Sequence, residues 1–271
     1  IGGRYHEINV QSLSYTEFML FHQLEDCDES LWKYINYGGL PGLRQVGITE
    51  DEFVWDYIKG VHSTVVLKDI IERQNIRNIH FLNNLLRYFA DTIGKLTSLN
   101  NISKYMKSQG QDVAVKSVSS YLSYFKDAYL VSTVERYDIH GKKLLESNEK
   151  VYFGDIGLRN YISGGERVDD IEKVIENIVY LQLKLMGYKV SVGQLRAGEV
   201  DFVCTKQNER VYVQVAYLIP SKETEEREFG ALQNIQDNYP KYVISMTPLV
   251  KRSDNEGVIH LGLREFLKNG F

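Results

Sequence analysis

Acidic and amide side chains recur in two stretches of the C-terminal half, residues 198–203 and 211–216, which have the composition of β-strands. A polar turn, residues 206–209, joins the two stretches. If this turn is centred on its middle peptide bond, Asp201 lies opposite Gln214 in an antiparallel pair. Because side chains alternate between the two faces of a strand, this register gathers polar groups on one face of the predicted hairpin.

The chemistry that this pattern favours is metal-dependent hydrolysis of a phosphodiester. An acid on one strand, followed by acid-X-Lys on the next, is a common arrangement in magnesium-dependent nucleases, where carboxylates hold the ion and the lysine stabilises charge. The predicted register also sets Glu199 opposite Ala216. Gln214 then stands where the second acid is expected, and Ala216 stands where the lysine is expected. We predict a nuclease-like scaffold with a degenerate catalytic site.

A third carboxylate, Glu176, lies among apolar residues in a predicted helix. Burying a carboxylate is costly unless it gains a partner, so Glu176 is expected to approach Asp201 where the helix packs on the sheet. The candidate catalytic residues are Glu176, Asp201 and Gln214, with Glu199 as a further ligand. Mg²⁺ at Glu176 and Asp201 is expected only if the site is active; salt-bridged, purely structural roles for both carboxylates stay open.

A second candidate site lies in the middle of the chain. A short helix at 101–107, a helix at 115–128 and strand-like runs at 130–137 and 144–153 follow one another, which is the order of a winged-helix domain. Ammonium and hydroxyl groups suit contacts to phosphates and base edges. The candidate nucleic-acid-binding residues of the second helix and the hairpin tip are Lys116, Ser117, Ser120, Lys126, Lys142 and Lys143.

Winged helices also serve as protein-docking modules, and this region is only mildly basic. The whole chain carries a formal net charge of −4, so any nucleic-acid binding must come from a local patch. DNA binding and protein docking therefore both remain open for this region.

The elements that must position the carboxylates follow residue 165. The predicted order is helix, three strands, helix, strand and a last helix, at 171–185, 189–192, 199–205, 211–219, 223–237, 242–246 and 263–268. This order predicts an α/β core with one crossover, since a parallel pairing of the last two strands requires the intervening helix. Nearer the N-terminus, the spacing of Ser14 and Glu17 predicts a capping box, and residues 49–97 have helical periodicity.

Composition limits the setting. The chain has 271 residues and contains no apolar run of about 18 residues, so we expect no membrane partner. The N-terminus has no secretory signal pattern, and the two cysteines, Cys27 and Cys204, stand in dissimilar contexts. These features favour a cytoplasmic protein.

Short motifs recur in a specific order along nearly the whole chain. In the first half they are Gly3-Arg4-Tyr5, Leu13-Ser14-Tyr15-Thr16-Glu17-Phe18 and Gly38-Gly39-Leu40-Pro41. In the second half they are Phe153-Gly154-Asp155-Ile156-Gly157-Leu158, Glu176-Asn177, Gly187-Tyr188, Glu199-Val200-Asp201-Phe202, Gln214-Val215-Ala216, Arg227-Glu228 and Asn238-Tyr239-Pro240-Lys241-Tyr242. With these motifs the chain resembles bacterial and archaeal AAA+ ATPases that carry a C-terminal domain of restriction-endonuclease-like fold.

The resemblance implies a multidomain α plus α/β protein. Residues 1–48 would hold the end of the ATPase core and the start of a helical lid, 49–98 a helical region, 99–165 the winged helix, and 166–271 the nuclease-like domain. Arg4 matches an arginine that could sense nucleotide. The family also implies that Gln-Val-Ala is a recurring form of its last motif.

The sequence contains no G-x-x-x-x-G-K-[ST] motif, so ATP hydrolysis by this chain alone is not expected. ATP and Mg²⁺ would belong to a longer parent protein, and no cofactor is assigned to this chain. Expected partners are double-stranded DNA and an upstream ATPase domain, with homo-oligomerisation left open.

We therefore expect a regulatory and DNA-interaction region of a AAA+ ATPase with a degenerate nuclease-like domain. The alternatives are an active Mg²⁺-dependent DNA nuclease and a protein-docking module.

Overall fold

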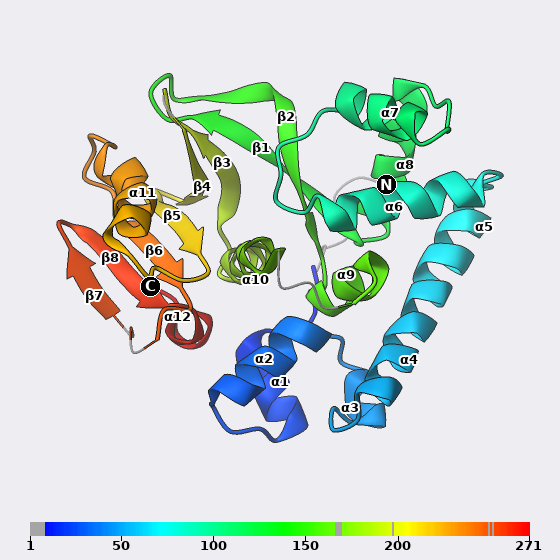
Figure 1. Ribbon diagram of the computed structural model, residues 1–271, viewed down its shortest axis with the longest axis horizontal. Coiled ribbons are helices and arrows are strands. Elements are labelled where there is room, and N and C mark those ends of the chain that lie inside the picture. The colour runs from blue at the N-terminus through cyan, green and yellow to red at the C-terminus, as the bar shows by residue number, and fades with distance from the viewer. Residues whose placement is uncertain (1–8, 166–169, 197, 249, 251) are drawn as a thin grey trace, which may run out of the picture.

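The computed structural model describes residues 9–165, 170–196, 198–248, 250 and 252–271, and Arg4 lies outside this part of the chain. The protein is a mixed α/β structure in which a helical N-terminal region packs beside one eight-stranded sheet (Figure 1). The coarse expectation of an α plus α/β protein is confirmed. Within the described residues, no helix is both long and apolar enough to cross a bilayer.

Helices make up most of the chain before residue 128. They are α1 (Tyr15–His22), α2 (Asp28–Tyr37), α3 (Leu43–Val46), α4 (Asp51–His62), the π-helix η1 (Ser63–Ile70), α5 (Ile71–Gln74), α6 (Ile79–Asp91), α7 (Leu99–Ser108) and α8 (Val115–Asp127). The predicted capping box is present at α1: the Ser14 hydroxyl accepts from the Glu17 backbone N–H, and the Glu17 carboxylate accepts from the Ser14 backbone N–H.

Strands dominate the second half. They are β1 (Val131–Asp138), β2 (Lys143–Phe153), β3 (Lys189–Gln194), β4 (Glu199–Lys206), β5 (Glu209–Ala216), β6 (Lys241–Ser245), β7 (Arg252–Asn255) and β8 (Val258–Gly262). The helices among them are α9 (Ile156–Ser163), α10 (Ile171–Leu185), α11 (Lys222–Gln233) and α12 (Leu263–Asn269). The short strands β7 and β8 were not predicted.

The strands lie in the order β2-β1-β3-β4-β5-β6-β8-β7. β5 and β6 run parallel and are linked through α11, so the predicted crossover is confirmed. β1 also runs parallel to β3, through the pairs from Arg136↔Val192 to Asp138↔Gln194. The hairpin assigned to the middle of the chain therefore extends the C-terminal sheet, and the predicted boundary at 165/166 falls between strands that share this sheet.

Two apolar cores cover the two faces of the sheet. Val211, Val213 and Val215 of β5 belong to the large core that includes buried residues of α10. Tyr212, on the alternate face of the same strand, packs in a second core with Phe229 of α11. Period-two alternation thus places α10 and α11 on opposite sides of β5.

Candidate functional site

The centre of the candidate site is a buried lysine that no part of the predicted motif contains. The ammonium Nζ of Lys150, on β2, lies 2.9 Å from Glu176 Oε1, 2.6 Å from Glu199 Oε1 and 3.2 Å from Asp201 Oδ1. The side chains of Lys150 and Glu176 are each only 1% exposed, whereas that of Glu199 is 30% exposed. One cation thus joins three carboxylates that come from α10 and from β4, a strand that β1 and β3 separate from β2.

An irregularity in the β1–β2 ladder precedes Lys150. The pairing passes from Val134↔Lys150 to Arg136↔Leu145, so that residues 146–149 stand opposite Glu135 alone. The bridge Thr97↔Glu149 connects this bulged segment to the α6–α7 connection. A bulge of this kind re-aims the side chains that flank it, and here it precedes the strand position that carries Lys150 into the sheet interior.

Glu176 is held from several directions besides Lys150. Its Oε2 accepts from Lys173 Nζ at 2.5 Å, and its Oε1 accepts from the hydroxyl of Tyr152, two residues along β2 from Lys150. Gly94 closes a further side, since a Cβ at that position would lie 3.2 Å from Glu176 Oε1. Three donors and the closely packed Gly94 thus surround the Glu176 carboxylate.

The electrostatics of the cluster favour a protonated lysine. Burial alone would lower the pKa of Lys150, but the charges of Asp201, Glu176 and Glu199 together raise it above its ordinary value. Burial raises the pKa of Glu176, and the nearby charge of Asp201 adds to that rise, while Lys150 and Lys173 act in the opposite direction. The ammonium of Lys150 is therefore the counter-charge that the buried carboxylates require.

The predicted β4–β5 register is confirmed as far as Phe202↔Val213, but the predicted pairs of Asp201 with Gln214 and of Glu199 with Ala216 lie beyond the ladder. The ladder runs from Lys206↔Glu209 to Phe202↔Val213, and beyond it side chains replace the backbone bonds. The Asp201 backbone N–H donates to Gln214 Oε1 at 3.2 Å, and the Val215 backbone N–H donates to Asp201 Oδ2 at 3.0 Å. The side chains of Asp201 and Gln214 thus hold β4 and β5 together beyond the end of their backbone ladder.

The amide of Gln214 continues the network toward α11. Its Nε2 donates to Glu228 Oε2 at 3.0 Å, and Glu228 is itself paired with Arg227. Glu228 is 3% exposed and was not among the predicted site residues. Gln214 therefore acts as a neutral link between Asp201 and a second buried carboxylate.

The structure gathers Glu176, Glu199 and Asp201 around Lys150, whereas Gln214 contacts the Asp201 backbone and turns toward Glu228 of α11. The position two residues after Gln214, where a nuclease motif has its lysine, holds Ala216, which is buried with 2% exposure. Lys150 supplies an ammonium to the same carboxylates from another strand. The signal that could have identified it is a lysine in a run that continues Val151, Tyr152 and Phe153, all of them buried.

The arrangement does not fit a bound Mg²⁺. An octahedral magnesium ion needs open carboxylate oxygens and space for water, whereas Lys150 Nζ stands within hydrogen-bonding distance of all three carboxylates. In the described part of the chain, no group of three or more His, Cys, Asp or Glu side chains has the geometry to hold a metal ion. We therefore derive no catalytic step through a metal.

Of the four candidate nucleic-acid residues of α8, the two lysines are exposed and the two serines are half-buried. Val118, Leu122 and Phe125 form the buried side of the helix, while Lys116 and Lys126 are exposed. The hydroxyl groups of the two predicted serines are less accessible to a ligand. Ser117 and Ser120 are half-buried, and Ser120 Oγ donates to the Lys116 backbone carbonyl at 3.1 Å.

Lys142 and Lys143 are exposed but lie elsewhere. They occupy the tip of the β1–β2 hairpin, which Figure 1 shows at the upper left, away from α7 and α8 at the right. The tip instead adjoins the β3–β4 turn, since the Ile139 backbone N–H donates to the Gln194 backbone carbonyl at 3.1 Å. The six predicted residues thus form two separate groups.

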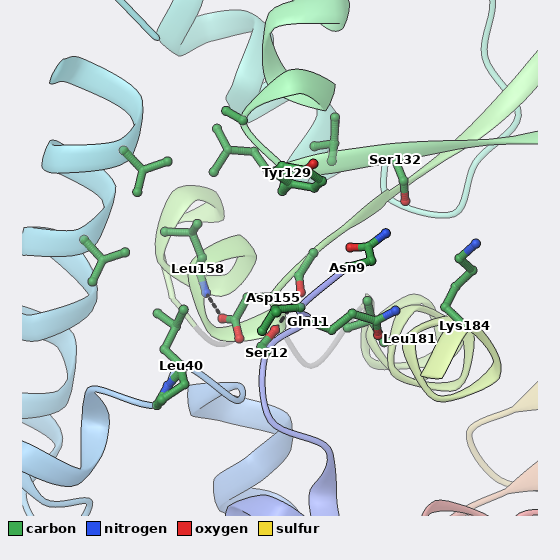
Figure 2. Close-up of a pocket in the computed structure, with 18 of the residues that line it drawn as sticks. Asn9, Gln11, Ser12, Leu40, Tyr129, Ser132, Asp155, Leu158, Leu181 and Lys184 are labelled. Atoms are coloured by element: carbon green, nitrogen blue, oxygen red, sulfur yellow. Dashed lines mark hydrogen bonds between the residues drawn. The ribbon is translucent and has the colours of Figure 1, made fainter. Parts of the chain in front are cut away.

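A cavity of about 400 Å³ lies apart from both sites (Figure 2). Its walls are mainly apolar and come from the segment before α1, from α4, η1 and α10, and from the connection between α8 and β1. Asp155, at its base, accepts from the backbone N–H groups of Leu158 and Gly39, both at 2.9 Å. Burial raises the pKa of Asp155, but these donors leave its oxygens committed to the fold rather than to a ligand.

Comparisons with known proteins find a family model and two uncharacterised relatives. The family model described as "Domain of unknown function (DUF8612)" matches residues 28–169. An uncharacterised protein of Haemophilus influenzae is 32% identical over 249 residues, covering 90% of this chain and 60% of the relative. The uncharacterised protein MJ1544 of Methanocaldococcus jannaschii is 24% identical over 250 residues, covering 85% of this chain and 54% of the relative.

The chain thus spans little more than half the length of these curated relatives. Among solved structures, the crystal structure of protein VC1899 from Vibrio cholerae aligns with 74% of this chain and 53% of that chain. The alignment has 14% identity and a TM-score of 0.26.

Proposed function

The chain belongs to the DUF8612 family, and from that premise we propose that it is a nucleic-acid-interaction region whose nuclease-like α/β part is catalytically silent. The observation that carries the proposal is the position of Lys150, whose ammonium lies 2.6–3.2 Å from three carboxylates that a nuclease would use for a metal ion. In this arrangement the lysine ammonium supplies the positive charge that a metal ion would supply in a nuclease.

The winged-helix interpretation is supported by the order of elements. Helices α6, α7 and α8 precede the β1–β2 hairpin, and the bridge Thr97↔Glu149 adds a short third pairing to that hairpin. A winged helix uses its last helix to contact DNA, and on α8 the side chains of Lys116 and Lys126 are exposed, with Lys126 Nζ donating to Thr133 Oγ1 at 3.1 Å. Both lysines suit phosphate contacts, which fix position rather than sequence preference.

The regulatory setting of the proposal follows from the resemblance to AAA+ ATPases. We infer that the chain works as the DNA-interaction part of such an ATPase, with ATP and Mg²⁺ bound outside this chain. The greater length of the relatives is compatible with this setting. Winged-helix regions also dock proteins, and the exposed lysines of α8 favour DNA over that alternative.

The test is duplex binding by fluorescence anisotropy across a series of salt concentrations. Lys116→Gln with Lys126→Gln is compared with Lys59→Gln plus Lys222→Gln, which removes the same charge from exposed lysines of α4 and α11. The α8 variant should reduce the slope of log K against log salt by up to about 2, because each lost phosphate contact contributes about 0.9. Equal slopes for the two variants would contradict the assignment of α8.

An active nuclease is the second candidate, and one observation favours it. Lys150 delivers an ammonium group to the carboxylates that lack the lysine expected at position 216, and such a group can stabilise charge on a phosphate. Plasmid incubation with Mg²⁺ or Mn²⁺ separates the candidates. The silent-site proposal requires intact plasmid; cleavage that disappears in Asp201→Ala would establish the nuclease instead.

A further inference from the structure

A basic surface at the ends of two hairpins has no role in the chemistry described above. The tip of β1–β2 and the β3–β4 turn emerge at the same end of the sheet, because β1 and β3 run parallel up to the pair Asp138↔Gln194. Residues 136–143 and 194–198 carry four cationic side chains and one carboxylate, a formal net charge of +3 in a chain of net charge −4. The cationic residues are Arg136, Lys142, Lys143 and Arg196.

The backbone that carries these cations is well braced. The Gln194 side chain accepts from the Arg136 guanidinium and donates to the backbone carbonyls of Leu195 and Gly198, at 2.7 and 3.0 Å. Asp138 Oδ1 accepts from the backbone N–H groups of His140 and Gly141, at 3.1 and 2.9 Å. The two tips are therefore fixed to each other and to their own turns before any ligand arrives.

The one carboxylate in this surface is already committed. The backbone donors of Gly141 and His140, together with the charge of Lys143, hold the pKa of Asp138 below its ordinary value. Among the described residues, no ion pair joins Arg136, Lys142, Lys143 or Arg196 to an acid.

Arg136 supplies a second and independent observation. Its Nε is buried and has no hydrogen-bond partner among the described residues, and its other guanidinium contact is to a neutral amide. Because no ion pair among the described residues neutralises this half-buried guanidinium, its charge adds to the positive potential at this end of the sheet, while its buried Nε is shielded from solvent. Lys142, Lys143 and Arg196 are exposed beside it.

We propose that these two hairpin ends form a second phosphate-binding surface, which holds the backbone of a DNA duplex at the opposite end of β1 from α8. The proposal rests on the nucleic-acid role proposed above and deepens it. β1 has eight residues, which span about 26 Å at about 3.3 Å per residue. This span corresponds to about eight base pairs at 3.4 Å each, so a duplex must be longer than that to reach both surfaces.

The experiment is anisotropy with duplexes of increasing length, using the full chain described here. The tip variant combines Lys142→Gln, Lys143→Gln and Arg196→Gln. Its matched control combines Lys59→Gln, Lys189→Gln and Lys222→Gln, which removes three exposed lysine charges elsewhere. Arg136 is left unchanged because its contact with Gln194 braces the turn.

The tip variant should lower the salt slope by up to about 3 on long duplexes, relative to the control. Wild-type affinity should also rise with duplex length more steeply than that of the tip variant. Equal slopes and equal length dependence for tip and control variants would overturn the proposal, as would binding of the wild type to anionic lipid vesicles but not to duplex.

The pattern of failures separates the two proposals. If the α8 variant loses affinity and the tip variant does not, the second surface is wrong and the α8 assignment stands. If only the tip variant loses affinity, the second surface stands and the α8 assignment falls. Absence of duplex binding by the wild type at low salt would remove both.

Discussion

Replacing Lys150 by Met should destabilise the protein more than any other single loss of a lysine charge in the described sheet. The substitution keeps the length of the side chain and removes the ammonium that lies within 3.2 Å of Glu176, Glu199 and Asp201. The first and last of these are buried, so their charges lose a partner that solvent cannot replace. Breaking a buried ion pair by removing one partner typically costs about 3–5 kcal/mol.

The size of the effect can be narrowed from the structure. Lys173 remains 2.5 Å from Glu176, and the hydroxyl of Tyr152 still donates to that carboxylate, so part of the charge stays compensated. We expect a loss of about 3 kcal/mol in the free energy of unfolding at neutral pH. For a chain of 271 residues, that loss corresponds to a fall in Tm of roughly 5 °C.

The assay is urea unfolding at neutral and at mildly acidic pH, with Lys143→Met as the matched control in the same strand, where the lysine is exposed. Burial already raises the pKa of Glu176, and loss of Lys150 removes a charge that lowers it. As pH falls, Glu176 of the variant should therefore take up a proton and lose its unpaired negative charge. The deficit of Lys150→Met should therefore shrink at lower pH. A deficit no larger than that of Lys143→Met would refute the role given to Lys150.

Two further predictions concern stability. Gly94→Ala should lower the free energy of unfolding in urea more than Gly47→Ala does. Both glycines have positive φ, where a Cβ costs about 1–2 kcal/mol, but only at Gly94 would the Cβ also press against Glu176. Equal losses for the two variants would contradict the close packing at Gly94. Burial holds the pKa of His260 below its ordinary value of 6.5, so the unfolded chain binds a proton that the folded one does not, and stability should fall as pH drops below 6.5. His260→Gln should flatten this dependence in pH-dependent thermal melts, and an unchanged profile would argue against a titrating contact with Ser245, whose Oγ lies 2.8 Å from His260 Nε2.

Local patterns in the sequence were sufficient to predict the β4–β5 hairpin, whose first strand carries Asp201. The polar turn between two apolar strands determines the register, and the observed pairs from Lys206↔Glu209 to Phe202↔Val213 follow it. The capping box at Ser14 was predictable for the same reason, since both of its hydrogen bonds join residues three apart. Short-range geometry of this kind is encoded within a few residues.

The contacts of Lys150 were not predictable in this way. They join residues 26 and 51 positions apart, through a ladder irregularity before Lys150 and a parallel pairing of β1 with β3. Parallel pairing leaves no turn signal in the sequence, because the connection between the strands is long. For the same reason the sequence grouped Lys142 and Lys143 with α8, although the sheet carries them to its other end.

The most direct test of the central claim is an electrophoretic experiment with a labelled duplex of about 30 base pairs, long enough for both proposed surfaces by the helical rise of DNA. The chain is mixed with the duplex at low salt in the presence of Mn²⁺ or Mg²⁺, and the products are run on native and denaturing gels. We predict a retarded complex that contains uncut DNA. Cleavage that is lost in Asp201→Ala, or no retardation at low salt, would contradict the account.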